Sequence, residues 1–372
     1  MPTFTLAFCT ARAFQNPTVA TSYSKAVPNY HISIDMPFDL PSVRSLRVRA
    51  ALSGQTAAQF RIAFERASVA MEADTTYTRV LATREHARLS RRNAQDADSL
   101  RRIAVARRDA GDASDLDVEL ATVTAGQAEN TAVNDSLSYL SALLDLQVVM
   151  GILSSAPFVV PSDSLTMPVV DTVTFAGIAT GIASDSLGIR AATTPLSVAA
   201  AQASLTSAQQ AVAVERRNLW GSPSLTAGFE MGDPSGAESG VLPTVGIALP
   251  LPLFNRNQGP IATALAEQRR AEAELSIARI TAQAEVARAR RELSFALDRL
   301  RRDQTLVTAA NRVAAMSLTA YREGASTLPN VLEARRNARD VVAQYVDDLA
   351  AAWIALAELR VLLLTPNSQA IR

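Results

Sequence analysis

Side chains that could bind a metal ion or attack a substrate are few in this chain and lie far apart. Cys9 is the one cysteine, and the two histidines are His31 and His86. A zinc site draws three or four ligands from such residues, so the sequence predicts neither a metal site nor a disulfide. There is also no HExxH motif, phosphate-binding loop or nucleophile elbow. We therefore expect no catalytic residues, no enzyme activity and no cofactor.

A polar run between residues 255 and 259 is the first candidate for function. It follows the proline-containing stretch PLPLF and precedes an alanine-rich segment. Either it binds a ligand or it joins two kinds of structure, and the second interpretation is favoured. The prolines would end a strand ladder, and Asn255 or a neighbour would cap the next helix. We expect this bend to be formed by Pro250, Pro252, Asn255 and Gly259.

A second polar cluster is acidic and spans residues 109 to 119. Its carboxylates could attract cations or the basic surface of a partner. They could equally belong to a solvated turn, because acidic side chains are favourable near a helix N-terminus. The acids are Asp109, Asp112, Asp115, Asp117 and Glu119.

Charge and hydropathy exclude two broad classes of protein. The 372 residues carry no formal net charge at neutral pH, which removes any bulk electrostatic argument for nucleic-acid binding. The most apolar long segment, residues 349–364, contains Glu358 and Arg360 and falls short of the ~20 residues that a spanning helix needs. The first residues lack a basic region and do not form a convincing signal peptide.

The chain is an internal duplication. The segment GDASDLDVELA from Gly111 matches GASTLPNVLEA from Gly324, an offset of 213 residues that also pairs Pro37 with Pro250. Each repeat has two alternating segments, then a long helical stretch, a glycine and a return helix. In the second repeat Leu225 begins a period-two alternation that is typical of a strand with one apolar face. The duplication therefore predicts a mainly α chain with a small β part.

The expected boundaries follow from this order. The first repeat, 1–151, has strands within 17–36, a long helix over 42–110, a tip at 111–114 and a return helix over 115–150. An irregular linker rich in Pro, Ser and Thr covers 152–183. The second repeat, 184–364, has a helix over 184–219, strands within 223–249, a long helix over 255–323, a tip at 324–327 and a return helix over 328–364. A tail covers 365–372.

The long helices carry the pattern of a coiled coil. Each would extend ~100 Å at the usual helical rise, far beyond a globular helix. Apolar residues recur every seven positions, with small alanines three or four positions away. A long helix on an ordinary core is the alternative, against which stand the length and the Arg-rich outer positions. The heptad residues are Val286, Leu293, Leu300, Val307, Ala314 and Tyr321, with Ala289, Ala296 and Ala310 beside them.

Both tips have the sequence of a tight helix hairpin. Gly111 and Gly324 can take the left-handed conformation that closes a helix. Ser114 and Thr327 then stand at the N-cap of the return helices, and Asp117 stands where a capping-box acid would. Each long helix is therefore expected to turn back within a few residues.

Four strands in one chain cannot close a barrel, and their open edges would invite aggregation. Several chains that contribute strands to one barrel would resolve this, so the pattern indicates a pore-forming oligomer. The chain resembles the TolC-like outer membrane factors in three segments: LPLFNRNQGPIATA, YREGASTLPNVLEARR and the apolar closing helix. The first of these is most similar to the heavy-metal (cobalt, zinc, cadmium) branch. The resemblance covers residues 12 to 364 in both repeats.

The resemblance implies a homotrimer whose twelve strands form a barrel in outer membrane lipid, with a long helical tunnel in the periplasm. It implies a periplasmic adaptor protein and an inner-membrane pump of the resistance-nodulation-division type as partners. The chain would supply a passive, gated conduit for heavy-metal cations or small toxic compounds. By the symmetry of the repeats, a helix equivalent to 184–219 and the export signal would precede Met1.

The same resemblance suggests where the periplasmic aperture and the adaptor-docking tip lie. Relatives place acids just after the second tip glycine, and this chain has Asn330 and Glu333 there. Asp117 and Tyr321 match positions that help to hold the tip closed, whereas Ser326 replaces a basic residue. Adaptor docking would use the four tip residues Gly111, Ser114, Gly324 and Thr327. Glu333 could also be a simple first-turn acid.

Other functions stay open at this stage. A drug-efflux or type I secretion conduit of the same family would share these features. A periplasmic adaptor also has a long helical hairpin, but only one within a small β domain. A soluble coiled-coil scaffold without a membrane role is the other competitor, which reconstitution in planar bilayers would separate from a channel.

Overall fold

The computed structural model describes residues 9–366, apart from 24, 26–28, 40, 154, 158, 169–193, 221 and 232–240. The start of the helix expected over 184–219, the loop at 232–240, most of the linker and the end of the tail lie outside these residues. The chain divides into two compact units. Unit 1 holds residues 1–64, 194–283 and 365–372, and unit 2 holds residues 65–193 and 284–364.

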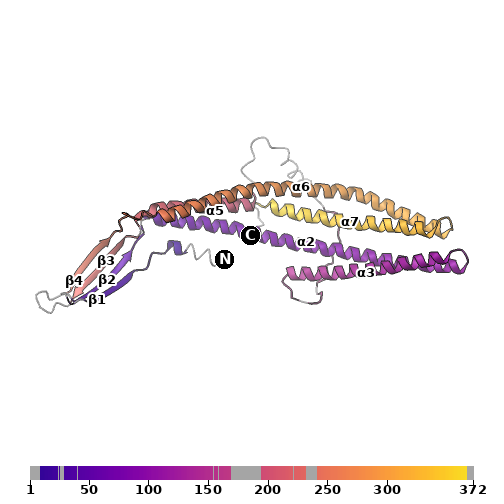
Figure 1. The fold of residues 1–372 in the computed structure, drawn as a ribbon, viewed down its shortest axis with the longest axis horizontal. Helices are drawn as coiled ribbons and strands as arrows, with labels where there is room; N and C mark the ends of the chain where they lie inside the picture. Colours follow the sequence, from indigo (N-terminus) through magenta and orange to yellow (C-terminus); the bar gives the residue numbers. More distant parts are fainter. Residues whose placement is uncertain are drawn as a thin grey trace, which may run out of the picture. The chain divides into compact units, whose positions relative to one another are not determined.

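Unit 1 contains a four-stranded antiparallel sheet (Figure 1). Its strands are β1 (Thr18–Tyr23), β2 (Tyr30–Pro37), β3 (Ser224–Met231) and β4 (Leu242–Ala248), in that spatial order. The central pair, β2 with β3, joins the two repeats. Gly228 permits this pairing, because a Cβ there would lie 2.6 Å from the Ile32 carbonyl oxygen. The expected mainly α fold with a small sheet is confirmed.

The sheet has one apolar face, and that face is exposed. Along β3 the apolar residues Leu225, Ala227, Phe229 and Met231 are exposed, while the polar positions between them are half-buried. The register places Ile34 beside Ala227 and Val245 on the other side of it. Val245 and Ile247 expose 77% and 75% of their surface. A water-soluble sheet turns this kind of face inward, so the arrangement is the reverse of the usual one.

The helical part of unit 1 consists of α5 (Leu196–Arg217) and the first parts of two long helices, α2 (Pro41–Asp109) and α6 (Gln258–Arg322). Val198 and Leu205 of α5 pack on Ala271 and Leu275 of α6. The Ser207 hydroxyl donates to the Ala50 carbonyl of α2 at 3.0 Å. A short 3₁₀ turn, η1 (Asn218–Trp220), leads from α5 toward the sheet.

Unit 2 consists of two helix hairpins. One pairs α2 with α3 (Asp115–Val149), and the other pairs α6 with α7 (Leu328–Leu362). The second hairpin has a core in which Leu293, Leu300 and Ala296 of α6 meet Leu356 and other residues of α7. Every predicted heptad position of α6 is buried or half-buried, as a coiled-coil seam requires. No helix among the described residues combines the length and the apolar character needed to cross a bilayer.

The tip glycines adopt the expected conformation. Gly111 and Gly324 have φ angles of +85° and +77°, which only glycine takes without strain. In the second hairpin the Ala325 N–H donates to the Ala320 carbonyl at 2.8 Å, and the Gly324 N–H donates to the Tyr321 carbonyl at 3.1 Å. This pair of bonds is a Schellman motif, and the first hairpin ends in the same way.

A carboxylate pair lies between α6 and α7. Asp348 is 5% exposed and its Oδ1 accepts from Arg299 Nε at 2.9 Å. Asp303 Oδ2 is buried and has no hydrogen-bond partner among the described residues. Burial raises the pKa of Asp303, the neighbouring Asp348 carboxylate adds to the shift because it favours a protonated Asp303, and the Arg302 and Arg299 charges oppose it. The folded state therefore holds a proton on Asp303 more tightly than the unfolded chain does.

We expect Asp303→Asn to stabilise the protein at neutral pH. Because the pKa of Asp303 is raised on folding, its contribution to stability falls as the pH rises from the ordinary Asp range through that raised pKa. The amide can donate to Asp348 without losing a proton, and the gain is about 1 kcal/mol, the order of cost of one unpaired buried acceptor. Thermal unfolding between pH 4.5 and 8 measures this, with exposed Asp298→Asn as the control. A variant that matches the wild type at pH 8 would contradict it.

Candidate functional site

The tips of the two hairpins meet in one small apolar cluster within unit 2. Leu100 and Ala104 of α2 and Val118 of α3 pack with Leu328 and Val331 of α7. Both hairpins turn at the same end of the unit (Figure 1). Because all four helices contribute, the cluster fixes the two turns side by side and makes the tip the best candidate for a functional site.

Tyr321 lies in this cluster and is the most buried of the predicted tip residues. Its side chain is 3% exposed, and its hydroxyl has no hydrogen-bond partner among the described residues. Arg107 of α2 lies over the Tyr321 ring, with Cζ 4.8 Å from the ring centroid. Arg107 Nη1 also donates to the Tyr321 carbonyl oxygen at 2.8 Å. Burial raises the pKa of Tyr321; Arg107 opposes this shift and Asp117 adds to it.

The first turn is stabilised by its own side chains. Ser114 and Asp117 form a capping box, in which the Asp117 N–H donates to Ser114 Oγ at 3.2 Å and the Ser114 N–H donates to Asp117 Oδ2 at 3.2 Å. Arg108 pairs with Asp109 at 2.6 Å and approaches Asp115 at 3.9 Å. Part of the acidic cluster is therefore neutralised locally, which favours its interpretation as a structured turn.

The second turn relies on backbone geometry. Thr327 occupies the N-cap position of α7 but makes no side-chain cap bond, and a proline stands in the first turn. Asn330 and Glu333 follow, one turn of helix apart, and both are exposed. Glu333 makes no ion pair within the part of the chain that the structure describes. Ser326 is half-buried.

The polar run before α6 forms a structural junction in unit 1. The helix begins at Gln258, three residues after the expected start, and Asn255 accepts from the Asn257 N–H at 2.9 Å. Asn257 has a φ of +59° and its carbonyl accepts the Ile261 N–H at 3.0 Å. Its side-chain amide donates to the Glu215 carbonyl oxygen and carboxylate, each at 2.8 Å. Asn257 thus ties the start of α6 to the end of α5.

The other predicted junction residues lie around this contact. Pro250 and Asn255 are exposed, Pro252 is half-buried, and Gly259 lies in the first turn of α6. The sequence predicts a cap by Asn255 or a neighbour, and the carbonyl that accepts the first helical N–H belongs to Asn257; Asn takes left-handed conformations more readily than most non-glycine residues. Its partner Glu215 is 42 residues away, and no local pattern points to it.

Comparison with known proteins shows what the chain is similar to. A family model described as outer membrane efflux protein matches residues 190–363. The second repeat of the chain is therefore similar to the outer membrane efflux protein family. Within the described residues, no group of three or more His, Cys, Asp or Glu side chains is placed to hold a metal ion.

Two further proteins extend the similarity to both repeats. It is 28% identical to the pyoverdine export outer membrane protein OpmQ of Pseudomonas aeruginosa, over 92% of this chain and 70% of that protein. It is 25% identical to the cobalt-zinc-cadmium resistance protein CzcC of Cupriavidus metallidurans, over 93% of this chain and 80% of that protein. The fold matches the outer membrane protein VceC of Vibrio cholerae with a TM-score of 0.73 at 16% identity, over 96% of this chain and 89% of that one.

The chain also has a structured segment in the part that the sequence predicts as an irregular linker. Residues 159–167, here called the strap, have no regular secondary structure but bind the helices of unit 2. The Val159 N–H donates to the Gln147 side chain of α3 at 3.3 Å. Trp353 Nε1 of α7 donates to the Thr166 carbonyl at 2.8 Å. Leu165 and Met167 pack against the core of α6 and α7.

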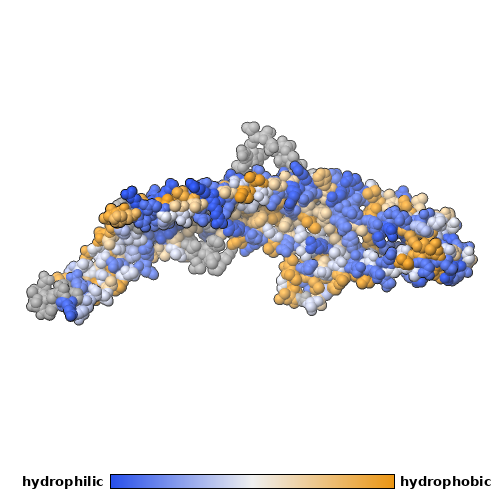
Figure 2. Space-filling view, viewed as in Figure 1, coloured by the Kyte–Doolittle hydropathy of each residue, from blue (hydrophilic) through white to orange (hydrophobic). Residues whose placement is uncertain are grey.

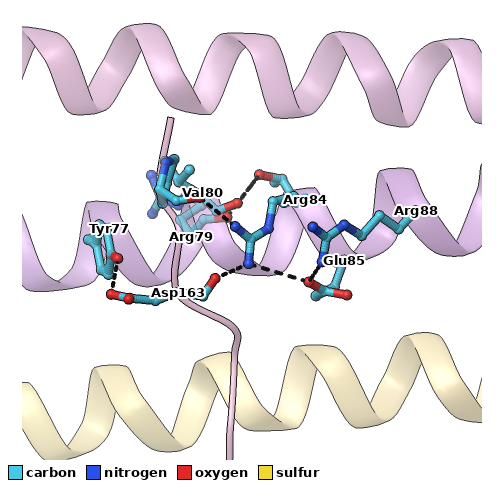
Figure 3. Close-up of polar contacts among 9 residues, drawn as sticks. Tyr77, Arg79, Val80, Arg84, Glu85, Arg88 and Asp163 are labelled. Atoms are coloured by element: carbon cyan, nitrogen blue, oxygen red, sulfur yellow. Dashed lines mark hydrogen bonds and ion pairs between the residues drawn. The ribbon is translucent and has the colours of Figure 1, made fainter. Parts of the chain in front are cut away.

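Arg84 of α2 is the main anchor of the strap. It is 7% exposed, and Nη1 donates to the Pro161 carbonyl at 2.7 Å while Nη2 donates to the Asp163 carbonyl. Tyr77 donates to the Asp163 carboxylate, a bond that raises the pKa of Tyr77. Figure 3 shows the strap crossing α2 between Tyr77 and Arg84. The buried Arg84 guanidinium therefore supplies hydrogen bonds to strap carbonyls that are not part of a helix or a sheet.

We expect Arg84→Met to destabilise the protein by about 2–3 kcal/mol, the usual cost when a buried, charge-assisted hydrogen-bond donor is lost. Methionine keeps the length of the apolar stem but leaves the Pro161 and Asp163 carbonyls without this donor. Urea unfolding of the detergent-solubilised protein measures the loss. Arg88→Met is the matched control, since Arg88 is exposed and pairs only with Glu85 among the described residues. Equal midpoints for the two variants would show that Arg84 does not hold the strap.

Proposed function

We propose that this protein is the outer membrane channel subunit of a tripartite efflux system and forms a passive, gated homotrimeric conduit that extends into the periplasm. The observation that carries the proposal is the exposed apolar face of the β1–β4 sheet. The comparisons support it, because the similar proteins are named as an outer membrane export protein and a resistance protein.

The sheet face favours contact with lipid. Moving exposed apolar surface out of water is favourable by about 25 cal/mol for each Å². Val19, Ile34, Phe229, Val245 and Ile247 lie on this face in four neighbouring strands. The opposite face carries Ser33, Thr226 and Glu230 among others, which suits a wet lumen. A sheet with these two faces fits the wall of a barrel in the outer membrane.

The sheet edges and the return helix favour assembly of several copies. β1 and β4 are the outer strands, and their free edges could pair with those of neighbouring copies to close a twelve-stranded barrel. On α3, Leu116, Leu120 and Val123 are exposed at helical spacing, and hydrophobic surface is visible near the hairpin turns in Figure 2. A second copy packed on this stripe would bury it.

The partners and the cargo follow from the family. A periplasmic adaptor protein would dock at the tip around Gly111, Ser114, Gly324 and Thr327, and an inner-membrane pump of the resistance-nodulation-division type would supply energy. Heavy-metal cations are the proposed cargo, from the relationship to CzcC. OpmQ is named for pyoverdine export, so a small-molecule cargo is the second candidate. Growth on zinc, cobalt or cadmium salts, and siderophore secretion, in a host that lacks its own channel distinguish the two.

An adaptor or a scaffold without a membrane role is the alternative from another class. Neither requires an apolar sheet face exposed to solvent, and neither has a strand pair before each of two hairpins. Insertion into lipid therefore separates the alternatives from the channel.

The first test is reconstitution in planar bilayers. The wild type is expected to insert and conduct, whereas Val245→Glu should fail to insert, since a charge on a lipid-facing strand costs about 2–4 kcal/mol near the midplane. Thr244→Glu is the matched control, because it places the same carboxylate on the adjacent residue and the opposite face. A wild type without single-channel currents, or equal behaviour of the two variants, would refute the proposal.

The second test concerns Glu333, which we propose forms a ring of three carboxylates at the periplasmic aperture of the trimer. Glu333→Gln should weaken block of the channel by multivalent cations several-fold, because the ring loses its charge but keeps its size. Glu323→Gln, at an exposed position beside the same turn, is the control. Identical block in the wild type and both variants would remove Glu333 from the gate.

A further inference from the structure

Arg107 connects the two hairpins at their tips. It belongs to α2, yet its Nη1 donates to the carbonyl of Tyr321 in α6 at 2.8 Å, across 214 positions of sequence. Its Nη2 lies 3.4 Å from the Asp112 carbonyl in its own turn. One guanidinium thus contacts the backbone of both turns.

The acceptor in the second turn is well suited to a cation. The Tyr321 carbonyl is one of the last in α6, where the helix ends in partial negative charge, and it also accepts the Gly324 N–H at 3.1 Å. A positive donor at this place can use the second lone pair of the carbonyl oxygen and interacts favourably with the helix dipole. The contact is to the backbone, so it does not depend on the hydroxyl of Tyr321.

The geometry also requires a planar cation. The guanidinium lies over the Tyr321 ring at 4.8 Å while it donates to the carbonyl of the same residue. Arginine can stack and donate at once, whereas the compact ammonium of lysine cannot reproduce both contacts. Gly324 is also close to the guanidinium, since a Cβ at this glycine would lie 4.0 Å from Arg107 Nη2.

The neighbouring arginine contrasts with Arg107. Arg108 pairs with Asp109 and Asp115, and both of these acids belong to its own hairpin. It is half-exposed and makes no ion pair with α6 or α7 among the described residues. The chain therefore offers two adjacent arginines, of which one bridges the hairpins and one does not.

We propose that Arg107 is the positioning residue that holds the α6–α7 turn against the α2–α3 turn and so sets the resting width of the periplasmic aperture. This rests on the proposed channel function. Removal of the guanidinium frees the second turn, which has no side-chain cap of its own. The aperture then opens more readily, while the rest of each hairpin keeps its core.

The test compares single-channel currents of Arg107→Ala, Arg107→Lys and Arg108→Ala in planar bilayers. Arg107→Ala should raise the open fraction roughly tenfold, the factor expected when one charge-assisted hydrogen bond is lost. Arg107→Lys should fall between Arg107→Ala and the wild type, and Arg108→Ala should match the wild type.

Chemical rescue distinguishes a local bridge from a general loss of structure. Millimolar guanidinium ion should return Arg107→Ala toward wild-type currents, whereas the same concentration of methylammonium should not. A wild type that conducts, together with an Arg107→Ala variant equal to Arg108→Ala, would overturn the role of Arg107 and leave the channel intact. A wild type that does not conduct would instead refute the channel. Arg107→Met, which keeps the stem, replaces Arg107→Ala if the alanine variant fails to assemble.

Discussion

The length of α2 and α6 is the constraint on which the rest of the structure depends. Helices of 69 and 65 residues are too long to pack on one globular core. Each helical turn must therefore pack against a neighbouring helix. Small residues make this possible, since Ala289 and Ala296 are fully buried against α7, and Ala271 is buried against α5. The shorter helices therefore pack along the long ones, and the turns that join α2 to α3 and α6 to α7 must be short.

The polar groups show how such narrow bundles are specified. A two-layer bundle has little core, so apolar packing alone leaves the register of neighbouring helices weakly determined. Buried or half-buried polar contacts supply that register: Arg84 fixes the strap on α2, Arg299 fixes Asp348 of α7 to α6, and Asn257 fixes α6 to α5. Each is directional, and each is lost if one helix slides by a single residue.

Local features of the sequence predicted most of the fold. The heptads of α6, the two tip glycines and the Ser114–Asp117 capping box depend on residues within one or two turns, and the structure has them where they were expected. The site was predicted less well, because its decisive contacts are long-range. Arg107 meets Tyr321 across 214 positions, and Asn257 meets Glu215 across 42. The strap has no periodicity at all, so only its tertiary partners show that it is ordered.

The two turns differ in how they are stabilised, although the repeats are similar in sequence order. The first turn contains its own side-chain cap. The second has a proline and an uncapped Thr327, and its Tyr321 carbonyl accepts a hydrogen bond from Arg107 of the other hairpin. The α2–α3 turn is therefore stabilised by its own residues, whereas the α6–α7 turn depends on a contact with the α2–α3 hairpin. In a gated channel this asymmetry makes the second hairpin the element that moves, because its turn has no side-chain cap and takes the Arg107 bridge and part of the apolar tip cluster from the other hairpin.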